Sequence, residues 1–232
     1  MARPDASGPR ARLNRPSVLA AAVALADEVG VEGLSMRRLA QELGVVPMAL
    51  YKHVRNKDEL LDGMVEFLIG EIGDVGETEA AEDWKGRART RVLAAREVLM
   101  RHPWARRLFE TRSTKTGAVL DYMNSFAGIL LSGGLSAELT HHAMHAIGGR
   151  MWGFTQELFE DEPSTPPQGP EAAAMMQEMA QRFPHIAAIA SMEHDDSVVG
   201  RGCDDQFEFE FALDLILDGI ERRHLSGWRS TP

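Results

Sequence analysis

The sequence predicts an all-α protein in which a small N-terminal domain of three helices precedes a larger C-terminal helical domain. Three observations support this fold class. Apolar residues recur at helical spacing through most of the 232 residues. Strand signals are scarce, because β-branched runs are short and no Asn-Gly or Asp-Gly hairpin separates alternating segments. Gly and Pro fall between the periodic segments, where they end or begin helices.

Composition limits the class of protein further. A hydrophobic content of 44% is enough for a sizeable core. The single cysteine, Cys203, excludes a disulfide framework and favours a cytoplasmic location. The sequence contains no apolar run of 18 residues, so no membrane span is predicted. The first residues are basic and lack the apolar stretch of a secretory signal, so we expect 1–14 to form a disordered basic arm.

Charge is distributed unevenly along the chain. The net charge is −10, yet residues 1–57 carry nine Lys or Arg against five acids, a balance of +4. The remainder carries −14. This asymmetry indicates a polyanion-binding end on an acidic body, although a chance fluctuation of surface charge would look the same.

Helix signals follow the arm in order. Pro16 is suited to the first helical position, and Gly30 and Gly33 mark the end of that helix. Ser35 is a good N-cap for a second helix, which Gly44 ends. The apolar residues of these two helices have helical spacing: Leu19, Ala22, Val23, Ala26, Leu39 and Leu43.

Two further helices complete the N-terminal region. Pro47 opens a very short third helix, with Leu50 and Val54 directed inward. Asn56 and Glu59 resemble a capping box and begin the fourth.

The C-terminal region predicts six more helices. A proline-rich loop at 160–170 interrupts them. We expect a domain at 15–62, a second domain at 63–225 and a flexible tail at 226–232. The helices are predicted at 83–101, 103–110, 115–132, 136–159, 171–193 and 204–224.

Residues 37–51 fit a helix-turn-helix. Ala40 is small where the next helix crosses, and Gly44 can adopt the left-handed conformation of the turn. Leu39, Leu43, Val45 and Leu50 would close a shared core, which leaves the second helix free to enter a major groove.

The segment 49–61, Ala-Leu-Tyr-Lys-His-Val-Arg-Asn-Lys-Asp-Glu-Leu-Leu, resembles the recognition-helix signature of the TetR family of transcriptional repressors. That signature reads Tyr-x-His/Tyr-Phe/Val-x-Asn/Ser-Lys-x-x-Leu, and the resemblance covers about residues 16–65. It implies a homodimer that binds a palindromic DNA operator and a small-molecule effector. The alternative is a helical hairpin that merely packs.

DNA-binding roles follow from side-chain chemistry and from the family pattern. Arg37 can reach guanine with its planar guanidinium. Pro47, Met48 and Ala49 suit contact with thymine methyl groups. The family pattern assigns phosphate contacts to Tyr51, His53 and Lys57, and Lys52 adds positive charge.

The C-terminal region resembles the tetracycline-repressor subgroup in the order of its landmarks. These are Glu82-Asp83-Trp84, His102, the Glu110-Thr111-Arg112 turn, and Gly153 followed by Glu157. The drug-binding members use two histidines around a magnesium–tetracycline chelate, and Gly73 and Leu108 stand at the best-aligned positions here. Without these nitrogen ligands we expect no metal site, no cofactor and no magnesium-dependent response to tetracycline.

A mostly apolar effector pocket with a few polar anchors is expected among the C-terminal helices. Plain core packing of the aromatic residues is the alternative. The predicted effector-binding residues are Trp104, Thr111, Arg112, Asn124, Trp152, Gln156 and Glu157.

Dimerisation is predicted from two helices. Ala146, Gly149 and Gly153 form a low ridge at helical spacing. The last helix carries large apolar residues on more than one face, which need further cover. The resemblance implies a four-helix bundle between protomers, and a bundle within one chain is the alternative. The apolar residues of the last helix are Phe207, Phe211, Leu213, Ile216, Leu217 and Ile220.

Two other functions are weighed. His141 and His145 have a metal-holding spacing, but His142 stands where the glutamate of a His-Glu-x-x-His protease is needed, and Cys203 lacks a nucleophile signature. We therefore expect no enzymatic activity. A ligand-independent DNA-binding protein is the second alternative.

Overall fold

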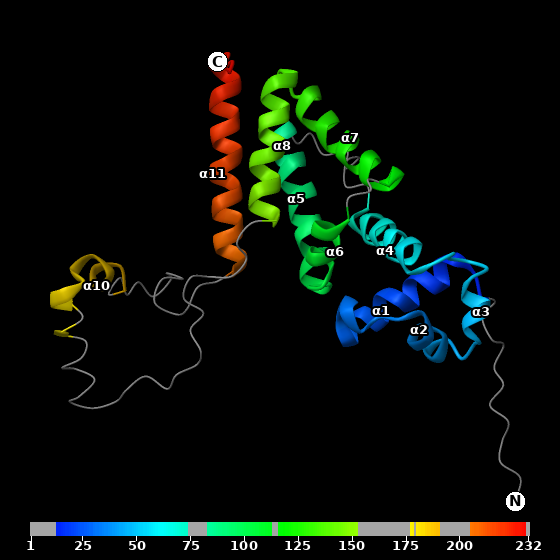
Figure 1. Cartoon of the computed structure of the whole chain (residues 1–232). Coiled ribbons are helices and arrows are strands. Elements are labelled where there is room, and N and C mark those ends of the chain that lie inside the picture. Colours follow the sequence, from blue (N-terminus) through cyan, green and yellow to red (C-terminus); the bar gives the residue numbers. More distant parts are fainter. Residues whose placement is uncertain are drawn as a thin grey trace, which may run out of the picture. The chain divides into compact units, whose positions relative to one another are not determined.

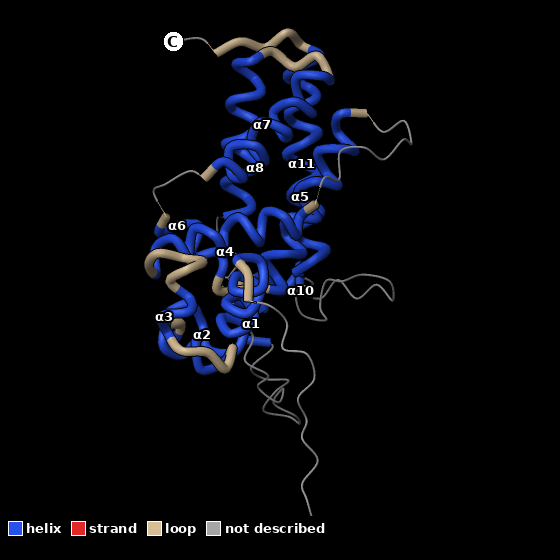
Figure 2. The backbone as a smooth tube through the Cα atoms, turned by 90° about the vertical axis from the view of Figure 1, so that its right-hand side faces the viewer, coloured by secondary structure: helices blue, strands red, loops and turns tan. Residues whose placement is uncertain are grey.

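The computed structural model describes residues 13–73, 83–112, 116–152, 177–178, 180–190 and 205–230. Every regular element in these ranges is a helix, which confirms the predicted all-α class (Figure 2). The helices are α1 (Arg15–Gly33), α2 (Met36–Glu42), α3 (Pro47–Leu50), α4 (Lys57–Ile72), α5 (Trp84–Arg101), α6 (Ala105–Thr111), α7 (Gly117–Ser132), α8 (Ala137–Trp152), α10 (Pro184–Ala190) and α11 (Asp205–Leu225), as Figure 1 labels them.

Packing divides the chain into two units, Met1–Met144 with Trp228–Pro232, and His145–Gly227. The first unit contains α1–α7 and the first half of α8. We call α1–α3 the head. The predicted arm at 1–14 lies almost entirely outside the described residues.

Capping residues start the head helices close to the predicted positions. The Asn14 side chain accepts a hydrogen bond from the Ser17 backbone N–H at 2.8 Å, so α1 begins at Arg15 and Pro16 is its second residue. Ser35 Oγ accepts from the Arg38 backbone N–H at 3.2 Å, as its N-cap role requires. α1 continues through a kink at Gly30, whose φ of 72° suits glycine.

The helix α4 packs against both the head and the helices that follow. Its buried face holds Leu60, Met64 and Leu68, all 0% exposed, and it contacts α1, α5, α6 and α7. Gly63 lets α1 come close, because a Cβ there would lie 2.6 Å from Leu19 Cδ2. Asn56 caps α4 through the Glu59 backbone N–H at 2.8 Å.

Trp84, the first residue of α5, packs against Gly133 at the end of α7. A Cβ on Gly133 would lie 2.3 Å from Trp84 Cγ, so only glycine leaves room for the indole. This contact fixes the antiparallel packing of α5 and α7.

The predicted continuous helix at 171–193 is wrong in one respect. Residues 180–182 are helical, Phe183 is not, and α10 starts at Pro184. The proline has no backbone N–H and clashes with the preceding turn, so it begins a new helix instead of continuing the old one. The other described C-terminal helices lie within two residues of their predicted starts.

Candidate nucleic-acid interface and effector region

The turn between α2 and α3 is a tight helix-turn-helix connection. Gly44 has a φ of 63°, in the left-handed region, and its N–H donates to the Gln41 carbonyl at 3.1 Å. The Val45 N–H then donates to the Ala40 carbonyl at 2.9 Å. Ala40 is buried, as its small size predicts. The turn therefore directs α3 away from α2 immediately after Gly44.

The short helix α3 separates an apolar inner side from an exposed outer side. Leu50 and Val54 are 0% and 1% exposed and join the head core. Met48 is 71% exposed, and Val46 just before the helix is 68% exposed. A protein surface that binds no partner rarely exposes so much apolar area beside a basic region. This outer side is the candidate contact with base edges.

Basic side chains lie around the outer side of α3. Arg37 and Lys52 are exposed and form no ion pair within the described part of the chain. Tyr51 is also exposed and His53 is half-buried. Lys57 Nζ donates to the Leu34 carbonyl at 2.7 Å, so this ammonium also holds the loop between α1 and α2.

Arg55, two residues before α4, is held by Glu59 in the first turn of that helix. Both its backbone N–H and its Nε–H donate to Glu59 Oε2, at 2.7 and 2.9 Å. Glu59 thus completes the cap one residue earlier than a regular capping box, which would use the Asn56 N–H. These hydrogen bonds lower the pKa of Glu59, the backbone bond from Arg55 most strongly.

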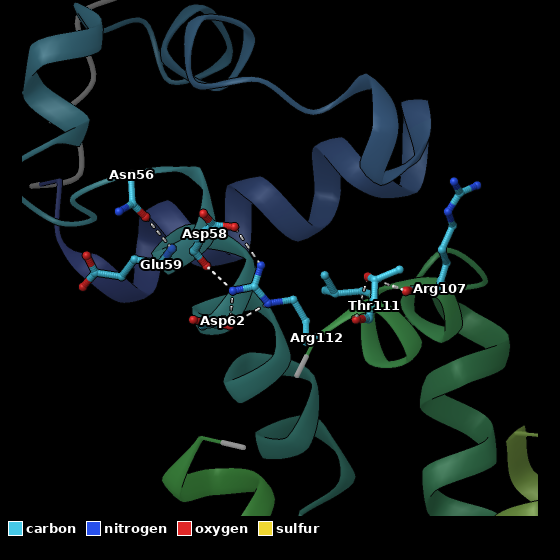
Figure 3. A network of polar contacts seen from close by, with 8 residues as sticks. Asn56, Asp58, Glu59, Asp62, Arg107, Thr111 and Arg112 are labelled. Carbon is cyan, nitrogen blue, oxygen red and sulfur yellow. Dashed lines mark hydrogen bonds and ion pairs between the residues drawn. The ribbon is translucent and has the colours of Figure 1, made fainter. Parts of the chain in front are cut away.

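In the effector region, two predicted anchors contact α4 and α6. Arg112, just after α6, donates from Nη1 to Asp58 at 2.9 Å and from Nε to Asp62 at 2.8 Å (Figure 3). Its side chain is only 17% exposed. Thr111 Oγ1 donates to the Arg107 carbonyl at 2.8 Å, within its own helix (Figure 3).

The other predicted effector residues are scattered. Trp104 Nε1–H donates to Asp27 of α1 at 2.7 Å. Asn124 is exposed on α7. Trp152 ends α8, and its side chain, like all of Gln156 and Glu157, lies outside the described residues. Whether these seven residues bind an effector stays a prediction.

Sequence reasoning missed a buried arginine on α5. Arg91 is 5% exposed, its Nη1–H donates to the Gly73 carbonyl at 2.9 Å, and its guanidinium lies 4.7 Å from the centre of the Tyr122 ring. Burial raises the pKa of Tyr122, and the charge of Arg91 partly opposes this. The signal was available, because Arg91 lies three residues after Ala88 and four before Ala95, on the buried face of α5.

Comparison with known proteins decides the family. Residues 18–64 match the bacterial regulatory proteins of the tetR family, and residues 77–224 match the tetracyclin repressor-like C-terminal domain. The chain belongs to the TetR family. It is a ligand-responsive, DNA-binding transcriptional repressor.

Several relatives and structures resemble it over nearly full length. The HTH-type transcriptional repressor DrrR1 of Streptomyces coeruleorubidus is 31% identical, over 94% of this chain and 81% of the relative. The class A tetracycline repressor from transposon 1721 in Escherichia coli is 29% identical, over 92% and 93%. The structure of ActR from Streptomyces coelicolor with actinorhodin has a TM-score of 0.67 at 26% identity, over 91% and 98%.

That Gly73 and Leu108 replace the metal-binding histidines of the drug-binding TetR members stays a prediction from the resemblance. The Gly73 carbonyl accepts the Arg91 hydrogen bond, and Leu108 is a buried apolar residue. The Arg91 guanidinium lies beside the backbone at Gly73. Glycine has no side chain and the leucine side chain is a hydrocarbon, so neither residue offers a side-chain nitrogen to a metal.

No described helix of this TetR-family chain is long and apolar enough to span a membrane.

Proposed function

We propose that two copies of this chain bind a palindromic operator as a homodimer, and that a small-molecule effector releases them. The exposed outer side of α3 carries this proposal, because Met48 and the preceding Val46 present apolar surface at the tip of a helix that cations surround. That combination suits a major groove, where thymine methyl groups and phosphates lie side by side. Such a protein would act in the cytoplasm and would not be an enzyme.

The predicted interface residues have the following proposed roles. Arg37 would read a guanine, and Pro47, Met48 and Ala49 would contact thymine methyl groups. Phosphate contacts would come from Tyr51, Lys52, His53 and Lys57. Lys57 would do so while keeping its bond to the Leu34 carbonyl, since an ammonium has three donors.

The two sides of α11 support the homodimer. Phe209, Leu213 and Leu217 are buried within their own chain. A second apolar row at i, i+4 and i+8 is exposed: Phe207, Phe211 and Leu215 are 48%, 54% and 56% exposed. Ala146 and Gly149 are likewise exposed on α8, and a Cβ on Gly149 would meet nothing within 4 Å. A large apolar row with small residues on α8 suits close helix packing against a second copy.

The effector site is proposed among the C-terminal helices. Asn124, Thr111, Trp152, Gln156 and Glu157 are the proposed direct contacts. Trp104 and Arg112 would respond to the effector through their bonds to Asp27, Asp58 and Asp62. An effector would lower DNA affinity if it binds more tightly to a state in which these residues are displaced than to the DNA-binding state. The loss of DNA affinity is set by the difference between the effector's affinities for these two states.

Selection of random duplex DNA by the purified full-length protein, followed by sequencing, tests this function. We expect one enriched palindrome with half-site centres about one helical turn apart. Arg37→Ala is expected to cost about 1–3 kcal/mol and to relax choice at one base pair. Arg38→Ala, which is exposed on the same helix, is the matched control and should leave the preferred sequence unchanged. No enrichment at low salt, with or without cell extract, would contradict the proposal.

A further inference from the structure

The corner between α5 and α6 makes a polar contact with the first helix of the head. Asp27 Oδ1, on α1, lies 2.7 Å from His102 Nδ1 and accepts the Trp104 Nε1–H at 2.7 Å. One carboxylate oxygen is therefore held by two donor groups that are 75 and 77 residues away in sequence. We call Asp27, His102 and Trp104 the corner joint.

The backbone fixes the two rings of the joint. The His102 N–H donates to the Val98 carbonyl at 3.0 Å and ends α5, and the His102 carbonyl accepts the Ala105 N–H at 2.8 Å. Trp104 is the N-cap residue of α6, and its ring lies edge-on to that of His102, with centroids 5.9 Å apart. Neither ring can follow α1 without moving α5 or α6.

His102 also reaches the helix α4. Its Nε2 lies 3.1 Å from Glu71 Oε2, which accepts a further hydrogen bond from Arg101 at 3.1 Å. The imidazole is 7% exposed and lies between carboxylates of two different helices. A protonated ring donates to both, and a neutral ring donates to one.

A second contact fixes the other end of α6. Arg112 binds Asp58 and Asp62 in the first turns of α4, as Figure 3 shows. The seven-residue helix α6 is thus tied to α1 at its start and to the start of α4 at its end. Since α1 and α4 pack together, both contacts act on the helices that carry α3.

A further ion pair between α6 and the head is more than half exposed at both of its side chains. The pair Arg107–Glu32 also links α6 to the head, but its side chains are 70% and 57% exposed, so solvent screens it and it adds little. In the corner joint the His102 side chain is 9% exposed and the Asp27 side chain 33% exposed, so solvent screens this charge-assisted contact less.

We propose that Asp27, His102 and Trp104 are positioning residues for DNA recognition, which hold the head in one orientation relative to α5–α7 and make it follow α6. This inference rests on the proposed function, because the orientation matters only if the head binds DNA. None of the three residues touches the exposed side of α3. Their effect on DNA is therefore indirect and passes through α1.

The test measures head orientation directly. Spin labels at Glu42→Cys on α2 and Asp121→Cys on α7, both exposed positions, are placed in full-length protein that carries Cys203→Ser. Labelled chains are diluted into a large excess of unlabelled chains, and electron–electron resonance gives the distance distribution between the labels. Four further variants are compared: Asp27→Ala, Asp27→Asn, Trp104→Phe and the control Glu110→Ala, which removes an ion pair with Arg106 within α6.

We expect a narrow distribution for the parent protein and for Glu110→Ala. Asp27→Ala, which loses the acceptor, should broaden it most. Trp104→Phe keeps an aromatic ring and loses the N–H donor, and Asp27→Asn keeps an acceptor oxygen, so both should be intermediate. Affinity for the selected operator should fall about tenfold for Asp27→Ala.

Distributions as narrow as the parent's in Asp27→Ala, with unchanged operator affinity, would overturn the proposal even if the melting temperature fell. A purely structural contact would lower stability alone. If the parent selects no operator, the proposed function fails, and the distance distributions still decide whether the joint orients the head.

Discussion

The head and the helices α5–α7 differ in where their charged side chains lie. In residues 13–57 every charged side chain that the structure describes is exposed or half-buried, and the core is apolar. The helix α5 buries Arg91 and Arg96, and His102 follows at its end. Burying a charge is costly unless it has partners. Arg91 donates to the Gly73 carbonyl after α4, and His102 lies beside the Asp27 carboxylate of α1.

This difference separates two kinds of function. A surface that binds a polyanion needs its cations in solvent, where they can release counterions. A region that responds to a small molecule needs polar groups inside, where few contacts decide between two arrangements.

The sharpest contrast within the head concerns two neighbours on α3. Leu50→Ala should lower the free energy of unfolding by about 2–5 kcal/mol, because Leu50 is fully buried. Met48→Ala should change it by less than about 0.5 kcal/mol, because Met48 is 71% exposed, yet should weaken operator binding. Denaturant unfolding and operator titration of both variants check this. Equal stability losses would show that α3 is not divided as described.

Gly133→Ala tests the packing of α5 against α7. The added methyl would overlap Trp84, so the free energy of unfolding should fall by about 1–3 kcal/mol. Gly128→Ala is the matched control on α7, where a Cβ meets nothing within 4 Å. Helix propensity should make that variant more stable by about 0.5–1 kcal/mol. Thermal unfolding in which the two changes have the same sign would contradict the packing described.

Tyr122 tests the buried charge of α5. Burial raises its pKa above the ordinary value of 10.0, and the nearby Arg91 charge lowers it. In a Tyr51→Phe background, ultraviolet titration should place ionisation above that value, and Arg91→Met should move it higher still. Because the pKa of Tyr122 is higher in the folded than in the unfolded state, the neutral phenol contributes to folding stability. This contribution is complete below the unfolded-state pKa and is lost as pH rises through the folded-state pKa. A downward shift in Arg91→Met would disprove the pairing.

Glu59 gives the smallest effect, at the exposed start of α4. Its pKa is lowered from 4.5 by the hydrogen bonds from Arg55. The associated stability is present above the unfolded pKa and is lost as pH falls through the lower folded value. Glu59→Gln should therefore show a shallower loss of stability between about pH 5 and 3 in urea unfolding. An unchanged profile would mean that the cap contributes nothing measurable.

Local chemistry made the head predictable from sequence. Ser35, Gly44 and Asn56 act on neighbours within a few residues, and each has the cap or turn that its residue type implies. Leu50 and Val54 are inward because helical spacing requires it. The same reasoning located most C-terminal helices. It failed at Pro184, because a proline within a stretch of helical periodicity begins a new helix instead of continuing the old one.

The effector region was less predictable, because its contacts join distant segments. Arg112 and Trp104 were predicted to line the pocket, and the structure adds bonds to Asp58, Asp62 and Asp27, which lie 50 or more residues away. No local pattern reveals such a partner. Periodicity could have flagged Arg91 as buried, but not that Gly73 and Tyr122 receive it.

Hydrogen exchange of the full-length protein, with and without its selected operator, would locate the DNA-binding surface. DNA contact through α2 and α3 predicts slower amide exchange concentrated in residues 36–57, with smaller changes in the helices α6 and α7. Slowing confined to 105–132, with none at 36–57, would contradict the claim that the exposed side of α3 is the DNA-binding surface.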